Sequence, residues 1–151
     1  EIIKTPPPSK VLKGWYFSNP TDVDAWRKGV DVETLTVVDN ALVRKAIGID
    51  PLIILKNDLN LDITNATHIK ITMKNSPMDI LGGLYSTTLT DTAFSEDKCV
   101  NFTIYNDNYC DYYIEVFNNA KWKGTLKSLR VDPMRYQGEF AIKSIEILGK
   151  D

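Results

Sequence analysis

The chain has 151 residues, of which 43% are hydrophobic and 25% are charged, and its formal net charge is −2 at pH 7. This length suits one domain with its own hydrophobic core. The near-neutral charge excludes the basic surface of a typical nucleic-acid-binding protein, and no apolar stretch approaches the roughly 18 residues that a membrane span requires. We therefore expect a single monomeric globular domain with no nucleic-acid partner and no membrane span.

The first residues predict an extended segment outside the domain. Three consecutive prolines at 6–8 favour polyproline II, a stiff extended conformation. We interpret residues 1–9 as a linker or as an N-terminal arm that lies along the domain, and residues 10–151 as the domain itself. Because the chain begins with Glu1 and not with Met, we also expect a mature fragment or an excised part of a longer, multimodular protein.

Short stretches rich in β-branched and aromatic residues alternate with turn-forming residues along the rest of the chain. In the stretch 68–74, strict alternation would place Ile69, Ile71 and Met73 in a core. A short helical turn is suggested only at 25–28. Nine stretches predict strands: 12–17, 32–38, 41–47, 68–74, 83–88, 100–105, 112–117, 125–131 and 140–148. Many short strands joined by polar turns predict an all-β fold, either an antiparallel β-sandwich or a jelly roll.

Two cysteines, Cys99 and Cys110, stand on either side of a predicted hairpin whose tip lies at 106–109. In such a hairpin Cys99 would lie opposite Phe117, and the two sulfur atoms would be too far apart for a disulfide. We therefore expect two free thiols that behave as small hydrophobic side chains.

The sequence offers little catalytic chemistry. Its one histidine, His68, lies within a predicted strand among lysines and away from any nucleophile motif. The spacing of cysteines and histidine predicts no zinc site, and no glycine-rich phosphate loop precedes a helix. Paired carboxylates could still support glycoside hydrolysis, and the candidates for that role are Glu33, Glu96, Glu115, Glu139 and Glu146.

The aromatic residues indicate binding more than catalysis, because the chain has three Trp, seven Tyr and five Phe. Sugars stack their C–H faces on aromatic rings while their hydroxyls bond to polar side chains on the same surface. In the stretch 112–117, alternation separates an inward set led by Tyr112 from an outward set led by Tyr113. We predict that one outer sheet face carries the ligand-binding residues Arg44, His68, Lys70, Tyr85, Tyr113, Glu115 and Arg130.

Other aromatic residues have different expected roles. Trp15 and Trp122 lie in apolar stretches and are predicted to pack in the core. Trp26 follows a polar loop and could serve either as a core residue or as an exposed platform. A site at the loop tips is a further possibility, with the candidates Tyr105, Tyr109 and Tyr136.

Several spaced motifs resemble those of one group of extracellular modules. Those motifs are Trp15-Tyr16-Phe17 leading to Trp26, Asp39-Asn40-Ala41-Leu42, Gly48-Ile49-Asp50-Pro51, Trp122-Lys123-Gly124-Thr125-Leu126, Leu129-Arg130-Val131-Asp132-Pro133, and Gly138 before the last strand. In this order they resemble the jelly-roll carbohydrate-binding modules with the galactose-binding-domain-like fold. The similarity covers nearly all of the chain after residue 10.

This resemblance implies a non-catalytic module that binds polysaccharide or oligosaccharide and accompanies a secreted or cell-surface protein outside the cell. Such modules bind glycan on a sheet face or in loops at one end. Relatives often hold a structural calcium ion between the first and last strands, but the matching positions here are Ser18 and Lys143. A calcium site would need other oxygen ligands, for which Asp39 and Glu146 are candidates. The resemblance implies no other cofactor.

Two alternatives stay open at this stage. One is a structural or protein-interaction sandwich without a sugar site, and the other is a small glycoside hydrolase or polysaccharide lyase. The charge of the glycan is also open, because the lysines and arginines of the predicted site would suit uronate or sulfate groups as well as hydroxyls.

Overall fold

The computed structural model describes residues 7–29, 35–46, 51–76, 80–105, 107–135 and 138–150, apart from the side chains of 44–46 and 80. In chain order, the elements are β1 (Lys10–Tyr16), α1 (Pro20–Asp24), β2 (Trp26–Lys28), β3 (Thr36–Val38), β4 (Ala41–Ala46), β5 (Ile53–Leu55), β6 (Leu61–Asp62), β7 (Ala66–Ser76), β8 (Ile80–Thr88), η1 (Glu96–Lys98), β9 (Cys99–Ile104), β10 (Cys110–Ile114), η2 (Val116–Asn118), β11 (Thr125–Asp132) and β12 (Gly138–Gly149).

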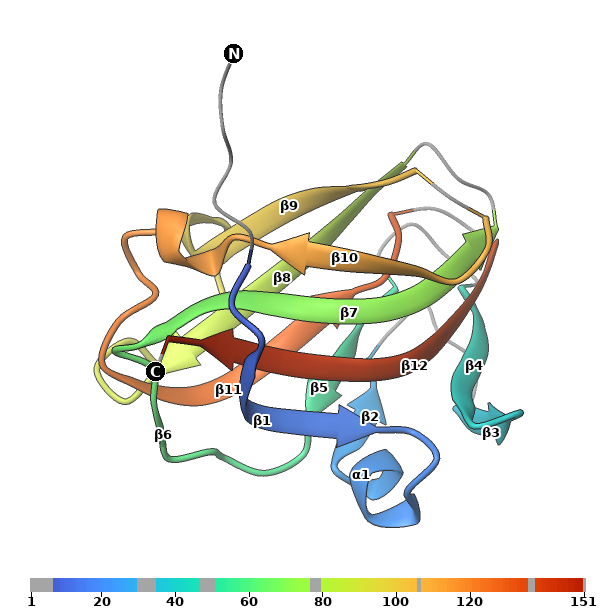
Figure 1. Ribbon diagram of the computed structural model, residues 1–151, viewed down its shortest axis with the longest axis horizontal. Coiled ribbons are helices and arrows are strands. Elements are labelled where there is room, and N and C mark those ends of the chain that lie inside the picture. The colour runs from blue at the N-terminus through green and yellow to red at the C-terminus, as the bar shows by residue number, and fades with distance from the viewer. Residues whose placement is uncertain are drawn as a thin grey trace.

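The strands form two antiparallel sheets that lie face to face (Figure 1). Sheet A has the order β10-β7-β12-β4-β3, and β1 pairs with β12 beyond the point where β4 ends. Sheet B has the order β2-β5-β11-β8-β9, and β6 pairs with β11. This arrangement confirms the predicted antiparallel sandwich. In the described part of the chain, no helix has the length and apolar character to cross a membrane.

The core lies between the two sheets and follows the predicted alternation. Ile69, Ile71 and Met73 of β7 are completely buried, as are Leu129 and Val131 of β11 in the facing sheet. A side chain between two such residues must point to the outer face of its sheet. Each sheet therefore has one outer face on which polar side chains can gather.

All three tryptophans belong to the core. Trp15 and Trp26 meet edge to face with their ring centroids 5.4 Å apart, an arrangement that aromatic pairs favour. Trp122 is also buried, and its indole N–H donates to the carbonyl of Ala66 at 2.9 Å. The predictions for Trp15 and Trp122 are confirmed. Trp26, for which a core position and an exposed platform were both open, is a core residue.

The predicted helical turn at 25–28 is wrong. The short helix α1 lies earlier, where the Asn19 side chain accepts a hydrogen bond from the Thr21 amide at 2.9 Å and Pro20 begins the first turn. Trp26 then starts β2, which pairs with β5. The strands β5 and β6 were not predicted, and the parts of the predicted strands at 32–34 and 47 lie outside the described residues.

The predicted hairpin around 106–109 is also wrong. β9 pairs with β8 in sheet B, whereas β10 pairs with β7 in sheet A, so the chain crosses between the sheets at this point. Cys99 therefore lies opposite Tyr85 and not opposite Phe117. Both cysteines are nevertheless free thiols, as expected.

Candidate functional site

A continuous row of outward-facing residues crosses the middle of sheet B. Strand pairing aligns Arg27 of β2 with Ile54 of β5, Ile54 with Arg130 of β11, Arg130 with Tyr85 of β8, and Tyr85 with Cys99 of β9. Directly opposed residues in antiparallel strands share one face of the sheet. The row therefore brings residues from five strands onto one surface.

Arg130 is held rigidly in the centre of this row. Its guanidinium lies 4.3 Å from the centroid of the Tyr85 ring, within the range of a cation–π contact. Its Nε and Nη2 atoms donate to the two carboxylate oxygens of Asp132 at 2.8 and 2.9 Å. Asp132 is only 1% exposed, while the Arg130 side chain is 18% exposed. A two-point contact with a buried carboxylate fixes the plane of the guanidinium.

A second arginine lies beside the first. Arg135 donates from Nη2 to the Asn101 side-chain oxygen at 2.8 Å and approaches the Tyr85 hydroxyl at 3.4 Å. Gly83 provides the space for it, because a Cβ atom at this position would lie 3.0 Å from that same nitrogen. The missing side chain thus lets the Arg135 guanidinium come close to the sheet.

The phenol of Tyr85 connects the two arginines to the loop after β8. Its hydroxyl donates to the Glu96 carboxylate at 2.8 Å. Burial, followed by this hydrogen bond, raises the pKa of Tyr85 far above its ordinary value. Burial likewise raises the pKa of the neighbouring Cys99 thiol, which therefore stays protonated at neutral pH. We call the following set the arginine cluster: Tyr85, Glu96, Asn101, Arg130, Asp132 and Arg135.

The structure separates the predicted site residues onto two faces. Tyr85 and Arg130 meet on sheet B, whereas Lys70 and Tyr113 lie on strands of sheet A. The expectation of one shared sheet face is therefore wrong. Tyr85 also differs from its predicted role as an open stacking surface, because it is only 3% exposed and lies beneath Arg130.

The remaining predicted residues belong to sheet A or to its surroundings. His68 of β7 lies on its outer face, where its ring is 5.5 Å from that of Phe117, and partial burial lowers the pKa of the imidazole. Glu115 follows β10 and accepts a hydrogen bond from Asn118 at 2.8 Å. Arg44 belongs to β4, but its side chain lies outside the described residues.

The outer face of sheet A has an ion-pair network of its own. Lys70 lies 3.7 Å from carboxylate oxygens of both Asp111 and Glu146. Glu146 also accepts a hydrogen bond from the Tyr16 hydroxyl at 2.7 Å. That bond, with smaller contributions from burial and nearby negative charge, raises the pKa of Tyr16 to about 12. Two tyrosines, Tyr16 and Tyr113, are 42% and 45% exposed beside this network.

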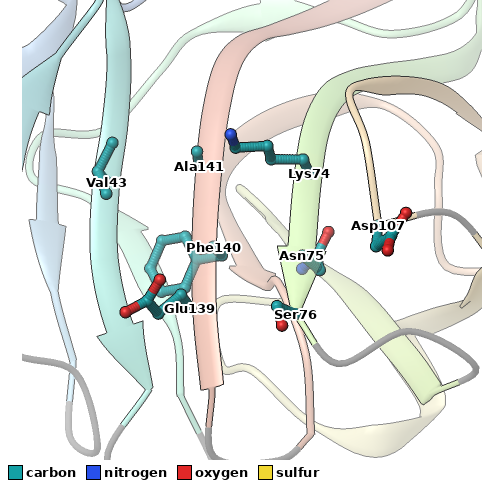
Figure 2. A pocket seen from close by; sticks show the side chains of 8 residues that line it. All are labelled: Val43, Lys74, Asn75, Ser76, Asp107, Glu139, Phe140 and Ala141. Atoms are coloured by element: carbon teal, nitrogen blue, oxygen red, sulfur yellow. The ribbon is translucent and has the colours of Figure 1, made fainter.

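A depression of about 230 Å³ lies farther along the same face. Figure 2 shows the Lys74 side chain extending from β7 toward Ala141 on β12, with Val43 on the next strand, β4. Lys74 and Lys143 lie 5.1 and 4.1 Å from the Tyr109 ring centroid. The one aromatic residue that lines the depression, Phe140, is only 1% exposed, so the depression is a weaker candidate for sugar stacking than the surface with Tyr16 and Tyr113.

The contacts of Glu146 bear on the predicted calcium site. Lys70 and Tyr16 engage its carboxylate, and an ammonium group beside a carboxylate competes with a cation for it. Within the described ranges, no group of three or more His, Cys, Asp or Glu side chains could hold a metal ion. Calcium binding near Asp39 and Glu146 stays a prediction.

Four members of the arginine cluster were missed in the sequence: Glu96, Asn101, Asp132 and Arg135. Asp132 could have been found, because it stands two positions after Arg130 on the same strand and must share its face. The other three are brought close by strand pairing and loop geometry, for which no local signal exists in the sequence.

Solved structures share this fold. An aspartate-to-alanine mutant of CBM29-2, a family 29 carbohydrate-binding module, superposes with a TM-score of 0.64 at 11% identity, over 89% of this chain and 83% of that chain. The apo structure of BiXyn10A CBM1 gives 0.61 at 14% identity, over 94% and 100%. PfGH50B gives 0.59 at 13% identity, over 83% of this chain and 22% of that chain.

The chain thus has the jelly-roll β-sandwich fold of carbohydrate-binding modules, which confirms the fold class expected from its motifs. No family model matches the chain, and none of the curated proteins matches it.

Proposed function

We propose that the chain is a non-catalytic module that binds a polysaccharide or oligosaccharide through the arginine cluster on sheet B. The observation that carries this proposal is Arg130, which lies on the ring of Tyr85 and is clamped by the buried Asp132. A sugar-binding surface needs donors and acceptors that are already in place, since ordering flexible side chains on binding costs affinity. Arg130 is fixed in this way before any ligand arrives.

The chemistry of the cluster suits hydroxyl-rich ligands. Guanidinium groups donate in a planar fork, and carboxylates and amide oxygens accept. The cluster combines Arg130 and Arg135 with the exposed acceptors Glu96 and Asn101, while the buried Asp132 orients Arg130. With two positive and two negative side chains, the cluster carries no net charge. We therefore propose neutral hydroxyl groups as the main ligand feature.

The spacing of two mutated residues in a structural neighbour supports this choice of residues. Structures of CBM29-2 that probe its mechanism of ligand recognition include an arginine-to-alanine mutant and an aspartate-to-alanine mutant two positions further on. Arg130 and Asp132 have the same spacing here. A lysine-to-alanine mutant of the same module is complexed with cellulohexaose, a neutral oligosaccharide.

The wider role follows from non-catalytic binding. We propose that the module serves a secreted or cell-surface protein and holds an attached enzyme close to its polymer, which raises the effective concentration of substrate. The affinity of a single site is expected in the range of roughly millimolar to micromolar Kd, since few side chains contact each sugar.

Affinity electrophoresis against a panel of neutral and acidic soluble polysaccharides tests the proposal. At least one polysaccharide should retard the wild-type chain, and Arg130→Ala should reduce the retardation at least tenfold in apparent Kd. Because Arg130→Ala removes two hydrogen bonds from the buried Asp132 carboxylate, its thermal unfolding midpoint should fall, so binding is compared at a temperature at which every variant is folded. Lys123→Ala, which removes an exposed lysine outside the cluster, is the matched control and should bind as wild type does.

Two results would contradict the proposal. One is the absence of retardation by every member of the panel. The other is retardation that Arg130→Ala leaves unchanged. Release of reducing ends or unsaturated products by the purified wild-type chain would instead establish the hydrolase or lyase alternative.

A further inference from the structure

The outer face of sheet A carries an arrangement that the arginine cluster does not use. In the register of four neighbouring strands, Tyr113 of β10 pairs with Lys70 of β7, Lys70 with Glu146 of β12, and Glu146 with Gly14 of β1. The ring of Tyr16 lies over Gly14, because a Cβ atom there would come within 2.8 Å of its carbon atoms. The face therefore presents a ring, an ion pair and a second ring in one row.

Both rings are exposed and yet have defined neighbours. Tyr16 is 42% exposed, and its hydroxyl donates to Glu146 at 2.7 Å, which fixes the direction of the side chain. Tyr113 is 45% exposed, and the Lys70 ammonium lies 5.9 Å from its ring centroid. Exposed tyrosines with few torsions offer contact area at low entropic cost. Two exposed rings held in this way can stack against the apolar faces of sugar rings.

A depression bounds this row on one side. It measures about 190 Å³, and the residues that line it include Pro7, Pro8, Ser9, Lys70, Tyr113 and Glu146. The residues before β1 thus form one wall, and Lys70 with Glu146 supplies a donor and an acceptor within it. Stiff prolines at the wall lose little conformational freedom when a ligand is bound.

The charges of the row select among ligands. Lys70 contributes one positive charge, and the two carboxylates within 3.7 Å of it, Asp111 and Glu146, contribute two negative charges. The surplus is one negative charge, which repels uronate and sulfate groups. Neutral hydroxyl groups, in contrast, can both donate to the carboxylates and accept from the ammonium.

We propose that Tyr16, Tyr113, Lys70 and Glu146 form a second saccharide-binding surface, specific for neutral sugars, on the sheet opposite the arginine cluster. The inward-facing neighbours of Lys70 and Arg130 are completely buried between the sheets, so the two surfaces face away from each other. The module is then bivalent and can link two polymer chains or two segments of one chain. This inference adds a second surface to the proposed function and is tested separately from it.

The experiment uses the full chain and a panel of soluble neutral polysaccharides, together with one polyuronate. Affinity electrophoresis measures retardation, and the turbidity or viscosity of a dilute polymer solution measures cross-linking. The variants are Tyr113→Ala, Arg130→Ala and the double variant, with Lys123→Ala as control. Thermal unfolding verifies that each variant is folded.

At least one neutral polymer should still retard Arg130→Ala. Adding Tyr113→Ala to that variant should lower its apparent affinity for the same polymer at least fivefold. Cross-linking of the polymer should be lost in either single variant, because it needs both surfaces. The polyuronate should not bind to Arg130→Ala. The second surface is refuted if Tyr113→Ala changes neither retardation nor cross-linking, or if Arg130→Ala abolishes binding to every neutral polymer. In both of these cases the arginine cluster keeps its proposed role, which fails if no polysaccharide retards the wild-type chain or if Arg130→Ala binds as wild type does.

Discussion

At the scale of single residues, two adjacent glycines of β8 show how closely the site and the core lie together. Gly82 faces the core, where a Cβ atom would come 2.5 Å from the Phe102 ring, whereas Gly83 faces outward beneath Arg135. A methyl group at either position therefore meets a different part of the molecule. Alanine substitutions at the two positions can therefore distinguish an effect on stability from an effect on binding.

Gly82→Ala should lower the free energy of unfolding by about 1–3 kcal/mol, because the core must shift to accept the methyl group. Gly83→Ala should change it by less than about 1 kcal/mol, because the nearest atoms are the flexible end of Arg135 at 3.0 Å and the Cys99 sulfur at 3.3 Å, which have to move only slightly. The same variant should weaken glycan binding several-fold, since the guanidinium leaves Asn101. Urea denaturation and affinity electrophoresis check the two effects, and equal losses of stability in both variants would contradict this assignment.

The Tyr16 hydroxyl makes stability depend on pH in the alkaline range. Its pKa is about 12 in the folded chain against an ordinary value of 10.0, so the hydrogen bond to Glu146 favours the folded state below pH 10. The contribution is lost as the pH rises from 10 through 12. Because the side chain is exposed to screening solvent, we expect only about 1 kcal/mol.

Tyr16→Phe provides the matching control. Urea denaturation at pH 9 should find wild type more stable than Tyr16→Phe by about 1 kcal/mol, and at pH 11.5 the difference should shrink. The subtraction removes the contributions of Tyr85 and Tyr105, whose pKa values are also raised. A difference that stays constant across this range would exclude the hydrogen bond as its source.

At the scale of elements, the loop between β8 and β9 positions Glu96 over Tyr85. Lys98, which is 5% exposed, holds this loop together through contacts to the Asp91 carboxylate and the Ala93 carbonyl. Removing the carboxylate would leave a buried ammonium group without its counter-charge. The loop, and with it the acceptor for Tyr85, depends on this pair.

Asp91→Ala should therefore lower the free energy of unfolding by about 2 kcal/mol, less than for a fully buried pair because Asp91 is 40% exposed. Lys98→Met, which removes the buried charge but keeps most of the volume, should cost less than Asp91→Ala. Chemical denaturation of both variants and of the double variant measures the coupling. Purely additive losses would show that the pair contributes nothing as a unit.

The sequence predicted the alternation within strands well, because the period of two is a local property. It identified the inward residues of β7 and the outward positions of Tyr113 and Arg130. It could not identify strand partners, since pairing is decided by long-range packing. For this reason the crossing between β9 and β10 was mistaken for a hairpin, and two faces were predicted as one.

The very short strands were also beyond local reasoning. Residues 53–55 form a purely apolar stretch with no alternation, and 61–62 are too few to show a period. These segments become strands because β11 and β2 are beside them. The contact between Arg135 and Asn101 in the candidate site could not be predicted for the same reason, because strand pairing brings the two residues together.

At the scale of the whole molecule, stability rests on packing between the sheets and not on a disulfide. We predict the same thermal unfolding midpoint with and without reducing agent. Alkylation of Cys99 should be much slower in the native chain than in urea, because burial raises the pKa of its thiol. Peptide mass spectrometry reads out the modification, and rapid labelling of native Cys99 at neutral pH would contradict the described burial.

The central strand of sheet A comes last in the described chain. β12 lies between β7, β4 and β1 and pairs with all three (Figure 1). During synthesis, β7, β4 and β1 are made well before residues 138–149. Until then these three strands lack the partner that joins them into one sheet. A nascent chain halted before Gly138 should consequently stay sensitive to protease and be held by chaperones, and it should acquire protection abruptly once its final strand has emerged.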